Sequence, residues 1–249
     1  MALLVFVLGL LIGSFLNVCI FRIPNRETII YGTSRCPHCR NSLGALDLIP
    51  VISYLVLKGN CRFCQSPISW RYPLVELLTG LIFYLGYISI GELHLLIKYL
   101  VLFSLLIIIS FIDIDRQLIP NQLVLAILVW GIGWQLLAPE LSWQQSLLGA
   151  ILGGGILLLI AVISKGGMGG GDIKLMFAAG LVLGGRFTVL ALFIACVIGA
   201  FVGGFLLATG IKKRKEPIPF GPFLSLGIFV ASLWGEQLIQ LYLTGSGLR

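Results

Sequence analysis

The run LLIKYLVLFSLLIIISFID, residues 95–113, carries a single charged side chain, Lys98, before it ends at Asp113. A helix needs about 20 apolar residues to cross the hydrocarbon core of a bilayer, and this run is of that length. Similar runs recur along the 249 residues, which are 58% hydrophobic and 11% charged, with a mean hydropathy of +1.05. A soluble domain of this size cannot bury so much apolar surface. The sequence therefore predicts an all-α polytopic membrane protein.

Eight apolar segments are expected to form transmembrane helices. The first has no basic region before it and no small-residue cleavage site after it, so we interpret it as a retained helix rather than a signal peptide. The segment 173–183 is the shortest and contains a glycine. The expected helices cover residues 1–20, 74–90, 95–112, 122–137, 146–164, 173–183, 187–210 and 220–243.

One sizeable polar segment, residues 22–72, separates the first two helices and divides the chain into 1–21, 22–72 and 73–249. Basic residues mark cytoplasmic loops, so this lobe is expected in the cytoplasm. Its stretch 46–57 is apolar but too short to span, and either packs on the lobe or lies at the membrane interface. The lobe contains seven basic residues, Arg22, Arg26, Arg35, Arg40, Lys58, Arg62 and Arg71, against Glu27 and Asp47.

The charge distribution supports one orientation. With the lobe inside, the next inside loops are 113–121, 165–172 and 211–219, the last of which contains KKRK. The outside connections, near GELH, APELSW and GGR, hold one arginine and no lysine. Both termini then fall outside. The positive-inside rule explains the net charge of +7 better than nucleic-acid binding does.

Two acids end up on the predicted inner face, at the ends of different helices. Asp172 follows the glycines of GGMGGGDIKL, residues 166–175, and Asp113 opens DIDRQLIPN, with Asp115 close by. Two neighbouring carboxylates share a proton and can hold a water between an acid and a base. That arrangement suits peptide hydrolysis without a covalent intermediate.

The glycine loop has other interpretations. Its glycines would let a substrate strand approach closely, but it could also be a flexible connection in which Asp172 pairs with Lys174 or caps the next helix. A phosphate-binding loop is disfavoured because no Gly-Lys-Ser/Thr closes it and no strand precedes it.

Four cysteines of the lobe form two C-x2-C pairs separated by 21 residues: Cys36, Cys39, Cys61 and Cys64. This spacing suits tetrahedral zinc, with two disulfides as the alternative that a cytoplasmic location disfavours. Four protein ligands leave no position for a catalytic water, so the zinc would be structural. A lobe of this size has little core, and metal binding would help it fold.

An ordered set of motifs resembles the bacterial type IV prepilin peptidase family. Gly169, Gly171 and Asp172 form the GxGD signature of membrane aspartic peptidases, and Lys174 extends it to GxGDxKL. DIDRQLIPN is similar to the family's other acidic motif. GSFLNVCIFRIP, CPHC, DLIPVISYL, CRFC and ISWRYPLVELLTG follow in the family's order.

The resemblance implies a bifunctional enzyme of the bacterial inner membrane, with its active site facing the cytoplasm. The family cleaves the basic leader of type IV prepilins and pseudopilins, then N-methylates the new terminus with S-adenosylmethionine. Its two catalytic aspartates correspond to Asp113 and Asp172, and Asp115 matches a frequent family acid. Gly169, Gly171 and Lys174 would support the site, and residues 73–249 would form a seven-helix peptidase domain.

Two other functions remain open from the residues alone. The chain could be a peptidase without methyltransferase activity. It could also be a non-enzymatic scaffold or a transporter, although no hydropathy repeat is evident and both acids lie at helix ends rather than at mid-membrane.

Overall fold

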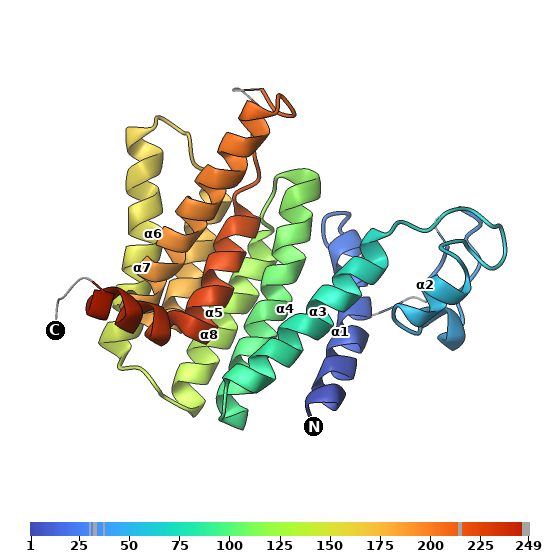
Figure 1. The fold of residues 1–249 in the computed structure, drawn as a ribbon, viewed down its shortest axis with the longest axis horizontal. Coiled ribbons are helices and arrows are strands. Elements are labelled where there is room, and N and C mark those ends of the chain that lie inside the picture. The colour runs from blue at the N-terminus through green and yellow to red at the C-terminus, as the bar shows by residue number, and fades with distance from the viewer. Residues whose placement is uncertain (30, 32–33, 37, 214–215, 246–249) are drawn as a thin grey trace. The chain divides into compact units, whose positions relative to one another are not determined.

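The computed structural model describes residues 1–29, 31, 34–36, 38–213 and 216–245 (Figure 1). Part of the expected lobe (30, 32–33 and 37) and part of the KKRK stretch (214–215) lie outside these ranges. The described residues form helices and no strand, which confirms the all-α prediction. The helices are α1 (Ala2–Arg22), the 3-10 helix η1 (Ala45–Leu48), α2 (Ile52–Val56), α3 (Arg71–Ser89), α4 (Leu93–Arg116), α5 (Asn121–Leu137), α6 (Trp143–Ile163), α7 (Gly170–Ala208) and α8 (Gly221–Gly245).

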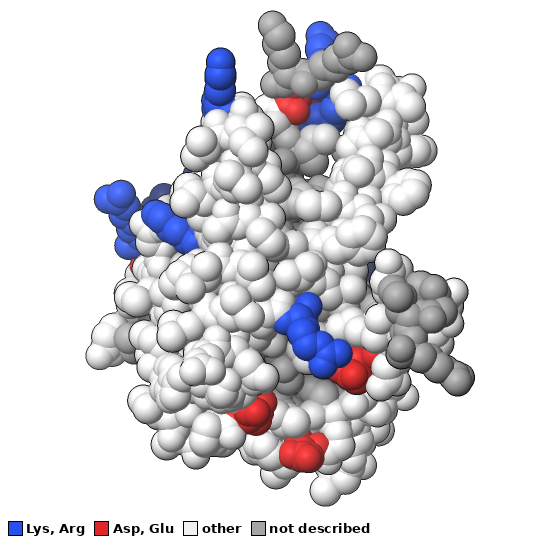
Figure 2. Space-filling model, turned by 90° about the vertical axis from the view of Figure 1, so that its left-hand side faces the viewer, with Lys and Arg blue, Asp and Glu red and all other residues white. Residues whose placement is uncertain are grey.

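Six of the described helices are long and apolar enough to cross a membrane: α1, α3, α4, α6, α7 and α8. The apolar helix α5 is shorter, with 17 residues. Large apolar side chains cover the outside of these helices, as with Phe201, which is 76% exposed. Figure 2 shows that few charged side chains interrupt one such face. This surface is expected of a protein whose solvent is lipid.

The 39 residues of α7 form two helical segments that meet at Gly184, whose φ of 75° and ψ of 167° are not helical. The Met176 carbonyl oxygen and the Thr188 side chain both lie beside Gly153 of α6. A straight helix would separate residues twelve apart by about 18 Å. The chain therefore folds back at Gly184, between the predicted segments 173–183 and 187–210. Glycine suits this position because it adopts positive φ without strain.

Two compact units divide the chain, residues 1–108 and 109–249, and the boundary falls within α4. In the first unit, α1 packs closely on α3. A Cβ on Gly9 would lie 2.7 Å from Cα of Gly80, and a Cβ on Gly13 would lie 2.7 Å from Cα of Glu76. Two helices approach this closely only when small residues face each other.

The second unit is built around α7, which packs on α5, α6 and α8. At the crossing of α6 and α7, a Cβ on Gly149 would overlap the backbone of Gly180, and the reverse also holds. One turn along, a Cβ on Gly153 would overlap the backbone of Met176. The two backbones are thus in direct contact, and this contact fixes the first half of α7.

We expect Gly149→Ala to destabilise the protein by about 1–3 kcal/mol, because the new methyl group forces the α6 and α7 backbones apart. The measurement is thermal unfolding in detergent. Gly155→Ala is the matched control on α6, since a Cβ there has nothing within 4 Å. Equal melting temperatures for the two variants would contradict the packing described.

Candidate active site and metal centre

Two buried carboxylates lie in the second unit, on different helices. Asp113 is near the end of α4 and is 6% exposed, and Asp172 is in the first turn of α7 and is 8% exposed. Asp113 is close enough for its charge to act on Asp172. Asp115 is exposed. The fold therefore brings together the two acids expected to pair and turns the third outward.

Asp113 is held by the beginning of α8. The backbone N–H of Gly221 donates to Oδ2 of Asp113 at 2.9 Å. A Cβ on Gly221 would lie 2.8 Å from that same oxygen, so only glycine lets the backbone come so close. By contrast, Oδ1 of Asp172 is buried without a hydrogen-bond partner among the described residues. Such an oxygen is unusual in a folded protein and can take a water, a proton or a substrate group.

The glycine loop brings Asp172 to this place. Gly169 caps α7, and its carbonyl oxygen accepts from the Asp172 N–H at 3.1 Å. A carboxylate in the first turn of a helix interacts favourably with the helix dipole. A Cβ on Gly171 would lie 2.9 Å from Cβ of Ile119, so this glycine lets α7 pack on the segment that follows Asp113.

Lys174 does not form an ion pair with Asp172 among the interactions described. Its Nζ donates instead to Oδ1 of Asn121 at 3.3 Å. Asn121 is the first residue of α5. Lys174 therefore links the beginning of α7 to the beginning of α5.

The four lobe cysteines, Cys36, Cys39, Cys61 and Cys64, form one cluster whose sulfur atoms all lie within 4.8 Å of one another. All six cysteines of the chain are free, so the alternative of two disulfides is not what the structure contains. The Sγ atoms of Cys36 and Cys64 are 3.8 Å apart. Four thiolates bound to zinc at ~2.3 Å in a tetrahedron lie about 3.8 Å apart, so the cluster fits this ion.

The two C-x2-C pairs are built alike. The N–H of Cys36 donates to the carbonyl of Asn41, as the N–H of Cys61 donates to that of Ser66. Arg40 and Gln65, which follow the second cysteine of each pair, both have φ of 58°. Each pair is thus a tight turn that points two sulfur atoms to one side.

Hydrogen bonds within this cluster favour thiolates at two of its positions. The backbone N–H of Cys39 is the main cause that lowers the pKa of Cys36 to about 6. The Ser66 hydroxyl lowers the pKa of Cys64. Both thiols are thus easier to deprotonate than an ordinary cysteine, as metal ligands must be.

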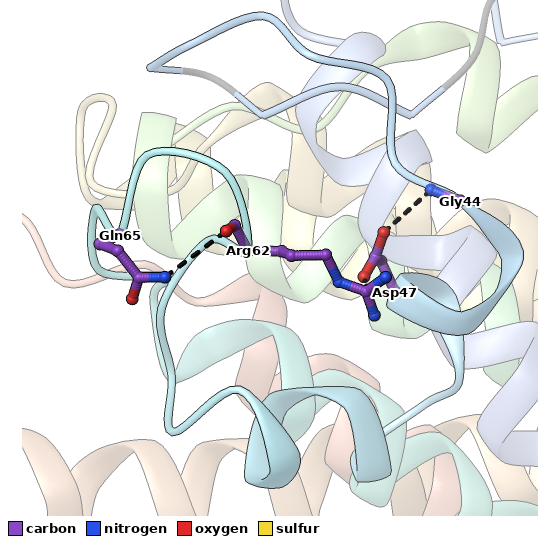
Figure 3. A network of polar contacts seen from close by, with 4 residues as sticks. All are labelled: Gly44, Asp47, Arg62 and Gln65. Carbon is purple, nitrogen blue, oxygen red and sulfur yellow. Dashed lines mark hydrogen bonds and ion pairs between the residues drawn. The ribbon is translucent and has the colours of Figure 1, made fainter.

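A polar network joins η1 to the second cysteine pair (Figure 3). The carboxylate of Asp47 accepts from the Gly44 N–H at 3.1 Å and forms an ion pair with Arg62 at 2.9 Å. Gln65 donates to the Arg62 carbonyl at 3.5 Å. The Asp47 side chain is only 5% exposed, so the carboxylate of η1 points into the lobe.

Ile119 and Asn121 stand in the motif DIDRQLIPN, whereas Gly221 lies outside every motif that predicted the site. Gly221 stands in FGPF, residues 220–223, directly before a helix-starting proline, a pattern that marks a tight approach to a helix N-terminus. The glycine–proline pattern indicates where a helix begins with free backbone N–H groups, but it does not indicate which carboxylate accepts a hydrogen bond from them.

The fold and site together describe a polytopic helical membrane protein with a pair of buried acids and a four-cysteine lobe. Residues 7–90 match the Bacterial Peptidase A24 N-terminal domain, and residues 100–204 match the Type IV leader peptidase family. No solved structure matches the chain significantly.

Curated relatives cover nearly the whole chain, and each of the three below is named Prepilin leader peptidase/N-methyltransferase. That of Bacillus subtilis (strain 168) is 39% identical, over 96% of this chain and 97% of its own length. Those of Aeromonas hydrophila and Pseudomonas aeruginosa are 37% and 34% identical, each over 97% of this chain and 93% of its own length. The chain therefore belongs to the type IV leader peptidase family.

Proposed function

We propose that this protein cleaves the basic leader of type IV prepilins or pseudopilins and then N-methylates the new terminal residue. The observation that carries the proposal is the pair of neighbouring buried carboxylates, Asp113 and Asp172. The names of relatives along the full chain support both activities.

The two acids would act on a water molecule. One carboxylate takes a proton from the water, and the oxygen of that water attacks the scissile carbonyl carbon. The other carboxyl group, which is protonated, donates its proton to the carbonyl oxygen and takes it back when the tetrahedral adduct collapses. The first carboxyl group passes the proton from the water to the leaving nitrogen, which departs as an amine when the C–N bond breaks. The Gly221 N–H keeps Asp113 in place, and the unpartnered Oδ1 of Asp172 offers a position for the water or the shared proton. No covalent intermediate and no metal are required.

The neighbouring residues would position this pair. Gly169 and Gly171 allow the start of α7 to pack tightly, and Lys174 ties it to α5 through Asn121. Asp115, which is exposed, would not belong to the dyad. We place residues 73–249 in a peptidase domain and residues 22–72 in a separate lobe.

The site would face the cytoplasm. A basic leader stays on the cytoplasmic side of a membrane while an apolar pilin stem enters the bilayer. The scissile bond would then lie at the inner interface, where the charge distribution puts both acids.

The methyl donor would be S-adenosylmethionine, which supplies an electrophilic methyl group to an amine. The described residues form no strand, so the strand and glycine loop of soluble nucleotide-binding domains do not occur among them. The methylation proposal therefore relies on the relatives' names alone.

We propose zinc as the ion of the four-cysteine cluster, with a structural role. All four ligands come from the protein, and the fit of the sulfur spacing to tetrahedral zinc supports this choice.

The first test is cleavage of a prepilin peptide by purified protein, with S-adenosylmethionine present and products read by mass. We expect Asp113→Asn and Asp172→Asn to lose at least about 100-fold in cleavage rate, because each removes half of the acid–base pair. Asp115→Asn is the control and should retain cleavage. A product one CH2 heavier than the cleaved peptide reports methylation.

Two results would change the assignment. Retained cleavage in both Asp113→Asn and Asp172→Asn would overturn the aspartic mechanism. Loss in Asp115→Asn with activity in Asp113→Asn would make Asp115 the partner of Asp172. A cleaved but unmethylated product would leave a peptidase alone.

Gly221→Ala should lower kcat about 10-fold or more with little change in KM, since its methyl group displaces the Asp113 carboxylate rather than a substrate contact. Gly245→Ala is the control on α8, because a Cβ there has nothing within 4 Å. The measurement is the kcat and KM of both variants in steady-state kinetics, at a temperature where both remain folded. An unchanged kcat would show that the contact of Gly221 with Asp113 does not matter for turnover.

Metal analysis tests the cluster. Purified protein should contain about one zinc per chain, and Cys61→Ser should lose it and unfold its lobe at lower temperature, because a structural site contributes folding free energy. Cys196→Ser, an exposed cysteine of α7, should keep the metal. Equal zinc contents in the two variants would rule out the four-cysteine site.

A further inference from the structure

Four apolar side chains of the lobe face outward on a short stretch around α2. Leu46, Ile52, Leu55 and Val56 are between 59% and 73% exposed. We call these four residues the apolar patch. No charged residue occurs between Asp47 and Lys58. Of the two interpretations that the sequence left open, packing within the lobe does not account for these four side chains.

One hydrogen bond determines the depth of the patch. The Val51 N–H, at the start of α2, donates to Oε2 of Glu76 at 2.8 Å. Glu76 lies five residues beyond Arg71, where the membrane-spanning helix α3 begins, which is about 7.5 Å along the helix axis. The beginning of α2 is therefore level with the second turn of α3.

The backbone of Val51 is strained at the point where it meets Glu76. Its φ of 63° is rare for a β-branched residue. Glu76, which accepts its N–H, is only 8% exposed. A strained residue persists only where its surroundings hold it.

The residues at the beginning of α3, about one and a half turns before this level, are those of a membrane interface. Trp70, which is 69% exposed, and Arg71 stand at the beginning of α3. Tryptophan and basic residues are typical of the headgroup region. An interfacial helix buries its apolar face about 5–10 Å into this region, which matches the level of α2.

The charge of the lobe determines what the patch meets. Seven basic residues stand against two acids, and one of those, Asp47, is already paired with Arg62. A basic lobe repels the basic leader of a prepilin and attracts anionic phospholipid headgroups.

We propose that the apolar patch is a lipid-binding anchor: it enters the headgroup and acyl boundary while the basic residues of the lobe bind anionic headgroups. The four-cysteine cluster and the Asp47–Arg62 ion pair hold the stretch in shape, and the Glu76 hydrogen bond holds it at the right depth. This surface does not depend on the proposed peptidase activity.

The test uses the full-length protein in nanodiscs of phosphatidylglycerol, with the photoreactive amino acid benzoylphenylalanine in place of Leu55. Irradiation followed by intact-mass analysis should show phospholipid adducts. Asn41 is the matched control, because it is exposed on the same lobe but outside the patch. We expect at least about five-fold more lipid adduct at position 55 than at position 41, since only the former reaches the acyl boundary.

In a second set of nanodiscs, phosphatidylcholine replaces phosphatidylglycerol. In a parallel set, a prepilin peptide is added. Basic residues near a membrane surface are attracted to anionic lipid, so the yield at position 55 should fall in the neutral discs. Equal yields in the two lipids would overturn the role of anionic headgroups. Equal amounts of lipid adduct at positions 41 and 55 would contradict the proposal that the patch is a lipid anchor. Crosslinks from position 55 to a second copy of the chain or to the peptide, in place of lipid, would also contradict it.

Discussion

The backbone contact between α6 and α7 is the constraint on which the acidic site depends. Because Gly149 and Gly180 have no side chains, the two helices touch along their backbones, and the first half of α7 can lie flat on α6. That half carries Asp172 in its first turn, and the reversal at Gly184 returns the chain toward α8. In lipid, where apolar side chains gain nothing from leaving the solvent, such close packing is a main source of helix association.

Two polar modules, one in each unit, are held by different means. The Asp113 carboxylate accepts from the backbone N–H of Gly221, a donor that is available because a helix begins there. The lobe, in contrast, has little apolar interior and is shaped by sulfur atoms, by the Asp47–Arg62 ion pair and by the hydrogen bond between Val51 and Glu76. Changes in one module need not disturb the other.

Hydropathy predicted every long helix, since spans of apolar residues are a local property of the chain. The expected break between 183 and 187 coincides with Gly184, and all-helical architecture is confirmed. The beginnings of α3 and α7 were expected three residues too late, because arginine and glycine are poor signals of a helix that starts at an interface. Motif spacing also predicted the cysteine cluster.

The contacts that the sequence could not reveal are those between distant segments. Gly221 meets Asp113 across 108 residues, and Glu76 meets Val51 across 25. Both involve a backbone N–H, which every residue except proline has, so no residue type marks them. Lys174 illustrates the reverse problem: its proximity to Asp172 in sequence suggested an ion pair, but its side chain reaches Asn121.

The reversal at Gly184 has a consequence for the surrounding bilayer. Residues 170–183 make a helix of about 21 Å, against a hydrocarbon core of about 30 Å. Its neighbour α5 is also short. A bilayer accommodates short helices by thinning locally. Water and headgroups would then come closer to the acid at the beginning of α7 than they do around the longer helices, so the lipid itself becomes part of the environment in which a bond can be hydrolysed.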